Sequence, residues 1–292
     1  MGRRRAPTEA PPTEDSHSDT DIAQDFEPDS GSEADSQIVI DFECYRPRSQ
    51  DAMAFRTFLS GFLDTTPFYG GQLATLLAQQ EFVGSVLRVV DEDDVLSFIS
   101  CLNIGIYRNE EPVGQICQYL LRNTPKEHHQ LLDNLVNSAA SNRTAFIFHD
   151  RLINIPSELI VPLWERFEEE LQWAVEDGVV EYDFLNLIYM TFVYTPTQET
   201  AKKGKKKNQK RTAVVDFPRE PLYPKFEDEF LRQEAEISFT FNYGSMLSSP
   251  YDFDTKCERL VMVLSRRSLK RALEKASKAI SVPQFDLFDR TS

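Results

Sequence analysis

Hydrophobic residues are unevenly spread along the chain, and their spacing separates two polar ends from a long middle region. Residues 1–37 hold ten acids among many Ser, Thr and Pro residues. Such a segment buries too little apolar surface to offset the entropy lost on ordering. We therefore predict a disordered acidic tail over residues 1–37, a single folded domain over 38–282 and a short tail over 283–292.

Strands are predicted where β-branched and apolar residues form short runs or alternate with polar residues. Seven segments have this pattern: 38–43, 83–90, 95–103, 144–148, 184–194, 237–243 and 260–264. The second and third flank four consecutive acids, an arrangement that predicts an antiparallel hairpin.

Helices are predicted where apolar residues recur every three or four positions. These segments are 51–63, 72–80, 113–122, 126–139, a long helix from Pro162 to Gly178, and a last helix that Ser268 caps and Pro283 ends. Gly70 and Gly71 should form the turn before the second helix. Helices inserted among strands and hairpins predict an α/β (α+β) fold, with a mixed central sheet flanked by helices.

Charge narrows the classes of partner. The chain has 32 Lys and Arg against 47 Asp and Glu, a formal net charge of -15 at pH 7. This balance opposes phosphate and attracts cationic molecules, so we expect no direct sequence-specific contact with nucleic acid. The longest apolar segment, 184–194, is shorter than the roughly 18 residues of a membrane span, and no apolar stretch follows the first arginines. We expect an intracellular protein with no membrane contact.

Catalytic and metal-binding patterns are sparse. The four cysteines form no C-x-x-C pair, so reduced core thiols are expected in place of a zinc site or disulfides. The chain has no glycine-rich phosphate loop and no G-x-S-x-G turn. Only His149, beside Asp150 at a predicted strand end, could serve as a general base; a structural or surface histidine is the other interpretation, since the sequence reveals no partner group. We predict no catalytic residue, no cofactor and no metal.

Two groups of acids are candidates for contact with a basic client. One is the turn between the hairpin strands, and the other is the polar face of the long helix. The residues are Asp91, Glu92, Asp93 and Asp94 in the turn and Glu165, Glu168, Glu169 and Glu176 on the helix. Each group could instead be a solvated surface without a partner. The turn lacks the alternation and the glycine of a calcium loop.

A dense basic run interrupts this acidic chain within a predicted exposed loop over 195–213. Its members are Lys202, Lys203, Lys205, Lys206, Lys207, Lys210 and Arg211. Clusters of this kind are typical of nuclear localisation signals, which import receptors bind. A plain solvated loop, or contact with nucleic acid or with the acidic tail, are the alternatives. A second basic group, on the last helix, is expected to be its ordinary solvent-exposed face: Arg266, Arg267, Lys270, Arg271, Lys275 and Lys278.

Four stretches of the chain resemble the BCCIP family. They are IVIDFECY at 38–45, VGSV at 83–86 followed by FISCLN at 98–103, RLINIP at 151–156, and FTFNY at 239–243. The resemblance spans about residues 38–281 in the order of the family. It also includes the basic loop, because family members carry lysines at the corresponding place.

The resemblance implies a fold similar to that of the GNAT acetyltransferases, without their activity. In keeping with this, the chain lacks the R/Q-x-x-G-x-G/A loop that wraps the pyrophosphate of acetyl-CoA. It also implies a nuclear protein, shuttling with the cytoplasm, that chaperones a basic ribosomal protein, universal protein fourteen of the large subunit, in ribosome biogenesis and export. Animal members are also associated with DNA-repair and cell-cycle proteins. A scaffold for such factors, or an acyl-CoA-dependent acyltransferase, are the alternatives.

Overall fold

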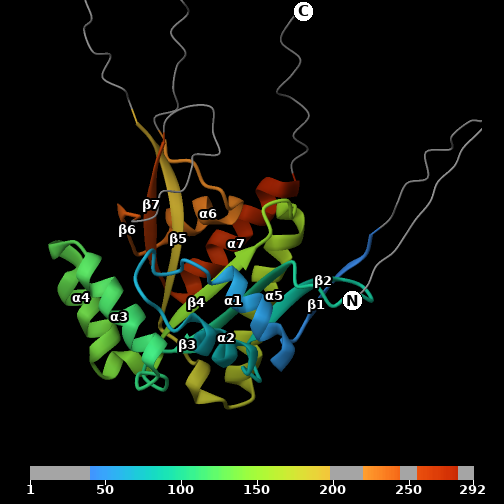
Figure 1. Ribbon diagram of the computed structural model, residues 1–292, viewed down its shortest axis with the longest axis horizontal. Helices are drawn as coiled ribbons and strands as arrows, with labels where there is room; N and C mark the ends of the chain where they lie inside the picture. The colour runs from blue at the N-terminus through green and yellow to red at the C-terminus, as the bar shows by residue number, and fades with distance from the viewer. Residues whose placement is uncertain (1–39, 198–219, 244–254, 282–292) are drawn as a thin grey trace, which may run out of the picture. The chain divides into compact units, whose positions relative to one another are not determined.

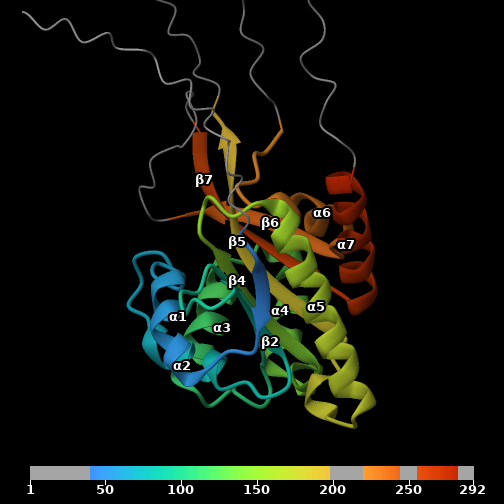
Figure 2. The ribbon, with the colours of Figure 1, turned by 90° about the vertical axis from the view of Figure 1, so that its right-hand side faces the viewer.

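Side chains of the strand β3 (Ser97–Asn103) alternate between two separate hydrophobic clusters. Phe98 and Leu102 belong to one cluster, and Ile99 and Cys101 belong to the other. A strand that is buried on both faces needs a covering layer on each side. The computed structural model describes residues 40–197, 220–243 and 255–281, and in it a sheet lies between two layers of helices (Figures 1 and 2).

The sheet has seven strands in the order β1-β2-β3-β4-β5-β7-β6. The other strands are β1 (Phe42–Tyr45), β2 (Gly84–Val89), β4 (Thr144–Arg151), β5 (Asn186–Pro196), β6 (Ile237–Asn242) and β7 (Thr255–Leu264). Neighbouring strands of this sheet are antiparallel, except β4 and β5, which are parallel. The predicted mixed sheet and the predicted hairpin of β2 and β3 are therefore confirmed.

Helices cover both faces of this sheet (Figure 2). On one face lie α1 (Ala52–Phe58), α2 (Gly70–Ala78), α3 (Glu111–Asn123) and α4 (Lys126–Asn137), and on the other lie α5 (Ser157–Glu176), α6 (Phe226–Glu234) and α7 (Arg266–Ser281). The sequence did not predict α6. No helix in the described ranges is both long enough and apolar enough to cross a membrane.

Aromatic side chains fill both layers of the core. Phe55 of α1 stacks on Phe98 with ring centroids 4.4 Å apart. On the opposite face Trp164 of α5 meets Tyr189 of β5 edge to face at 5.3 Å. Such pairs add about 0.5–1.5 kcal/mol to the free energy gained from burying the rings. They fix α1 and α5 against opposite sides of the sheet.

Two predicted helix starts are wrong. Gly70 and Gly71 are the first residues of α2, where the backbone N–H groups need no partner within the helix. The long helix α5 begins at Ser157 after Pro156, so Pro162 lies inside it and not in its first turn. Pro162 is exposed and removes one helical hydrogen bond, but the buried residues on either side keep the helix continuous.

The helix ends of α5 and α7 show the expected chemistry, with one change of residue. Gly178 follows α5 with φ of +80°, as predicted for a helix-ending glycine. At α7 the cap is Ser265 and not Ser268. The Ser265 N–H donates to Ser268 Oγ at 2.8 Å, and the Ser268 N–H donates to Ser265 Oγ at 3.2 Å. The two serines thus satisfy two backbone donors reciprocally.

Candidate functional site: an acidic helix face and a buried charge cluster

The polar face of α5 presents acids to solvent. Glu169 and Glu176 are exposed and Glu165 is half-buried. Gln172 donates to a carboxylate oxygen of Glu176 at 2.7 Å. Within the described ranges no cation pairs with any of these three carboxylates. We call Glu165, Glu169 and Glu176 the acidic face of α5.

The prediction that Glu168 lies on the exposed polar face of α5 is wrong. It is buried, and its Oε1 accepts from Arg266 Nη2 at 2.6 Å and lies 3.2 Å from Lys270 Nζ. Because both of these cations belong to α7, Glu168 joins α5 to α7 and does not face a client in solution. Its neighbour Glu169 points outward because a helix turns by about 100° per residue.

The cations of α7 are exposed as expected, except Arg266, which is half-buried, but four of the six also form ion pairs. Arg271 Nε lies 2.6 Å and Lys275 Nζ 2.5 Å from the carboxylate of Glu234 at the end of α6. The hydrogen bonds from Lys275 and Arg271 lower the pKa of Glu234. With Arg266 and Lys270 bound to Glu168, four of the basic side chains of α7 hold helices together. They are not available to neutralise the acidic face of α5.

The acidic turn between β2 and β3 is exposed over all four residues. Two arginines contact Asp93 in this turn. Arg48 Nη2 lies 2.6 Å from Asp93 Oδ1, and Arg88 Nε donates to the Asp93 carbonyl at 3.2 Å. Asp91 adopts a positive φ of 65°, which closes the turn. No group of three or more His, Cys, Asp or Glu side chains within the described residues could hold a metal ion.

The basic run from Lys202 to Arg211 lies outside the described residues, as do the tails 1–37 and 283–292. The interpretation of this run as a localisation signal therefore stays a prediction. Only residues 195–197 of the predicted loop are described. The first two of these belong to the end of β5.

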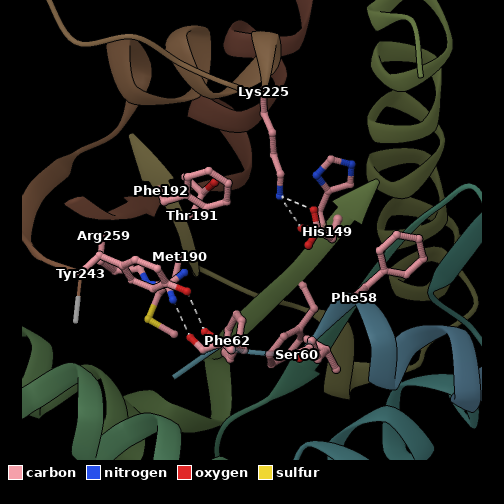
Figure 3. A pocket seen from close by; sticks show the side chains of 14 residues that line it. Phe58, Ser60, Phe62, His149, Met190, Thr191, Phe192, Lys225, Tyr243 and Arg259 are labelled. Carbon is pink, nitrogen blue, oxygen red and sulfur yellow. Dashed lines mark hydrogen bonds and ion pairs between the residues drawn. The ribbon is translucent and has the colours of Figure 1, made fainter. Parts of the chain in front are cut away.

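His149 has charged neighbours that the sequence did not reveal. β4 and β5 are paired only from Thr144 to Ile147, and beyond this point the strands separate. Lys225 enters the gap between them, donating to the His149 carbonyl at 2.9 Å and pairing with Asp150 at 3.1 Å (Figure 3). The lysine thus supplies a partner for a backbone carbonyl beyond the paired part of β4.

Two buried acids at the start of α6 complete this cluster. Glu227 lies 3.5 Å from His149 Nδ1 and 3.4 Å from Arg151 Nη2, and its side chain is fully buried. Asp228 is also fully buried and accepts a hydrogen bond from Thr191 Oγ1 at 2.7 Å. Sequence analysis missed both, because acids in a polar segment were assumed to be exposed. The apolar pair Phe226 and Phe230, one helical turn apart, was the available signal for α6.

Charge balance explains the protonation of the cluster. Burial, and after it the nearby Glu227 carboxylate, raise the pKa of Asp228 to about 7, and burial also raises the pKa of Glu227. Arg151 and Lys225 carry two positive charges. A proton on one of the three acids, Asp150, Glu227 and Asp228, therefore leaves the cluster neutral. Burial, with the two cations, lowers the pKa of His149 and keeps its imidazole uncharged.

The gap between β4 and β5 encloses a cavity of about 70 Å³ (Figure 3). Besides Lys225, its wall includes Arg259, which donates to the Phe62 carbonyl at 2.7 Å and lies over the ring of Tyr243 at 4.6 Å. Pockets for small-molecule ligands are typically about 300–1,000 Å³, so this space suits a few waters. Both ring nitrogens of His149 are buried, and neither forms a hydrogen bond with a described residue.

These features define the class. The chain is an α/β protein with a mixed sheet, in which Glu165, Glu169 and Glu176 have no cation paired with them among the described residues and the buried ionic groups serve its packing, consistent with a binding protein. The model of the BCCIP family matches residues 37–231, more than half of the chain. The chain therefore belongs to the BCCIP family, as its sequence motifs predicted.

Individual relatives agree with this assignment. Protein bcp1 of Schizosaccharomyces pombe is 28% identical over 211 residues, which cover 68% of this chain and 72% of that protein. The BRCA2 and CDKN1A-interacting protein of Bos taurus is 27% identical over 269 residues, which cover 84% and 85% of the two chains.

Solved structures extend the comparison to the fold. The crystal structure of BCP1 from Saccharomyces cerevisiae has a TM-score of 0.57 and 18% identity, covering 85% of this chain and 93% of that one. The two proteins thus share a fold. A putative phosphinothricin N-acetyltransferase, 10% identical over 77% of this chain and 99% of that one, has a TM-score of 0.37. At that score the match carries no argument about the fold.

Proposed function

We propose that this protein binds and escorts a basic protein, and that the client is a ribosomal protein of the large subunit, universal protein fourteen. The observation that carries the proposal is the distribution of charge. Four cations of α7 are paired with Glu168 or Glu234 of the same chain, whereas the acidic face of α5 has no cation paired with it among the described residues. A basic client would supply the missing positive charge.

Electrostatic attraction of this kind acts mainly on the rate of capture. Complementary charge raises association rates by about 10- to 1,000-fold at low salt and screens strongly as salt increases. Lasting affinity then depends on desolvated aromatic and arginine contacts at the centre of the interface. The proposal that the client is a ribosomal protein comes from the resemblance to the BCCIP family.

The first test is to mix the purified protein with candidate basic ribosomal proteins at moderate salt. We expect a soluble complex that survives size-exclusion chromatography. If none of the candidates forms one, the protein is not an escort of ribosomal proteins.

Neutralising the acidic face of α5 should slow client capture. In the variant E165Q/E169Q/E176Q we expect the association rate at low salt to fall about tenfold, with the difference shrinking at high salt. Stopped-flow mixing at two ionic strengths measures it. The matched control is E111Q/E127Q/D133N, which removes three exposed acids from α3 and α4 on the opposite face of the sheet. Equal slowing by both triples would mean that only net charge matters.

We also propose that the basic run directs the protein into the nucleus through import receptors and that it shuttles from there with its client. Replacing Lys202, Lys203, Lys205, Lys206, Lys207, Lys210 and Arg211 by glutamine should abolish nuclear accumulation of a fluorescent fusion. A variant with the six lysines changed to arginine keeps the charge and should still accumulate. Unchanged accumulation of the glutamine variant would rule out this signal.

A scaffold role is the second candidate, because one relative carries the name BRCA2 and CDKN1A-interacting protein. Affinity purification with mass spectrometry separates the two: an escort should retain ribosomal precursors, and a scaffold should retain repair or cell-cycle proteins. An acyltransferase is disfavoured because Lys225 enters the gap between β4 and β5 and the cavity left there is about 70 Å³. Pockets for small-molecule ligands are typically about 300–1,000 Å³. Tight binding of acetyl-CoA in isothermal titration would reverse that conclusion.

A further inference from the structure

A groove at the C-terminal end of α5 combines exposed aromatic rings with two acids that have no cation paired with them among the described residues. Trp173 is 52% exposed and Phe82 is 40% exposed, and both line this groove of about 410 Å³. Exposed tryptophan is unusual on a surface without a partner, and it is among the residues that contribute most to binding energy in protein interfaces.

The floor of the groove is rigid and electrically neutral. Glu170 is buried, and its carboxylate accepts hydrogen bonds from the Gly84 N–H at 2.9 Å, Ser85 Oγ at 2.7 Å and Arg166 Nε at 3.1 Å. Arg166 also donates to Ser85 Oγ at 3.0 Å. Since these groups satisfy one another and tie α5 to β2, the floor neither attracts nor repels a charged ligand strongly.

The rim of the groove at the end of α5 is negative. α5 ends at Glu176, its last turn contains no basic residue, and Asp177 follows directly. A helix C-terminus carries partial negative charge from its free carbonyl groups, and natural helices tend to place Lys, Arg or His there. Here two carboxylates stand in that position, and no cation among the described residues pairs with either. The groove therefore lacks a positive charge where the local field most favours one.

We infer that this groove binds an arginine side chain from an extended segment of the basic client, so the inference rests on the proposed function. A guanidinium can lie flat on the indole of Trp173 and donate two parallel hydrogen bonds to Glu176 or Asp177. Lysine supplies the charge without the planar stacking. Arg46 lines the other end of the groove and donates to the Glu81 carbonyl. Its charge disfavours a second cation there and sets the direction of the bound segment.

The protein has two tryptophans, which makes the groove directly observable. Trp164 is fully buried, so quenching by acrylamide reports mainly on Trp173. We would titrate the full chain with an unstructured peptide that contains arginine but no tryptophan or tyrosine, and with the same peptide carrying lysine or glutamine instead. We expect the arginine peptide to protect Trp173 from acrylamide, the lysine peptide to bind several-fold more weakly, and the glutamine peptide to have no effect.

Variants locate the binding. In W173F only Trp164 emits, so the peptide should leave the fluorescence unchanged. In E176Q/D177N the peptide affinity should fall about tenfold. If the arginine and glutamine peptides protect Trp173 equally, the groove does not recognise a cation and the inference is wrong. It is also wrong if replacing the lysines of 202–211 by glutamine tightens peptide binding tenfold, because the groove is then occupied by the chain's own basic run.

Client capture separates this inference from the proposed function. W173A should bind the purified ribosomal client at least tenfold more weakly than the wild type. Its urea denaturation curve should match that of the wild type, because the side chain is exposed. A wild-type complex that W173A forms equally well would refute the groove and leave the escort function in place. Failure of the wild type to bind any basic ribosomal protein would refute the escort, while the peptide titration would still decide on the groove.

Discussion

Replacing Asp51 by asparagine will lower the free energy of unfolding by about 3–5 kcal/mol, although the substitution changes only the charge of one small side chain. Asp51 is 3% exposed and its partner Arg88 is 2% exposed. One carboxylate oxygen accepts from Arg88 Nη2, and the other accepts from the Arg48 N–H at 2.7 Å. The amide cannot neutralise the guanidinium, so the variant leaves a buried positive charge without its counter-ion. Urea denaturation with an unchanged m-value measures the loss.

Two controls make this result specific. D93N removes the carboxylate from the exposed Arg48–Asp93 pair in the same part of the fold, and should cost less than about 1 kcal/mol. The double variant D51L/R88M removes both buried charges and should be more stable than D51N, since no lone ion remains. If D51N loses less than 1 kcal/mol, water reaches Arg88 and the pair is not dry.

The second large effect concerns pH. Burial raises the pKa of Asp228 to about 7, well above the value of about 4 expected in the unfolded chain. Between these two values the folded protein holds a proton that the unfolded protein has lost, so stability falls by up to about 1.4 kcal/mol per pH unit as pH rises from about 4 to 7. D228N keeps an acceptor for Thr191 and cannot ionise. We expect it to match the wild type near pH 4 and to exceed it by a few kcal/mol at pH 8.

Comparing the two proteins at each pH removes other titrating groups from the result. The lowered pKa of His149 acts in the opposite sense: its contribution to stability is lost as pH falls below about 6.5. Because both proteins contain His149, its contribution largely cancels in the difference. Chemical denaturation at several pH values from 4 to 8 gives that difference. A constant value across the range would show that Asp228 is ionised throughout, with its charge balanced by Lys225 and Arg151.

The strands were predictable because their signals are local. The runs that form β2 and β3 are apolar and flank a short polar turn, and the alternation of β6 places Phe239 in the core. α6 was not predictable by the same rule, since two of its acids point inward and only Phe226, Phe230 and Leu231 mark its apolar side. Sequence periodicity assigns acids to solvent, and the tertiary partners that allow their burial lie elsewhere in the chain.

The candidate site shows the same limit at the level of single residues. Glu168 and Glu169 are adjacent acids on one helix, yet one is buried against Arg266, which lies 98 residues further along the chain, and the other faces solvent. No pattern within α5 distinguishes them. Nothing in the sequence marks Trp173 as exposed, and its place in a groove with Phe82 follows only from the fold.

The parallel junction of β4 and β5 also bears on how the domain comes apart. Four residue pairs join these strands, whereas ten join β5 to β7. This line divides strands β1 to β4 from strands β5 to β7, and the helix α5, which contacts β2, β3 and α7, spans it. Because β1 to β4 pair in sequence with one another and β7 pairs with both β5 and β6, separating β4 from β5 would leave two smaller sheets that are each still hydrogen-bonded.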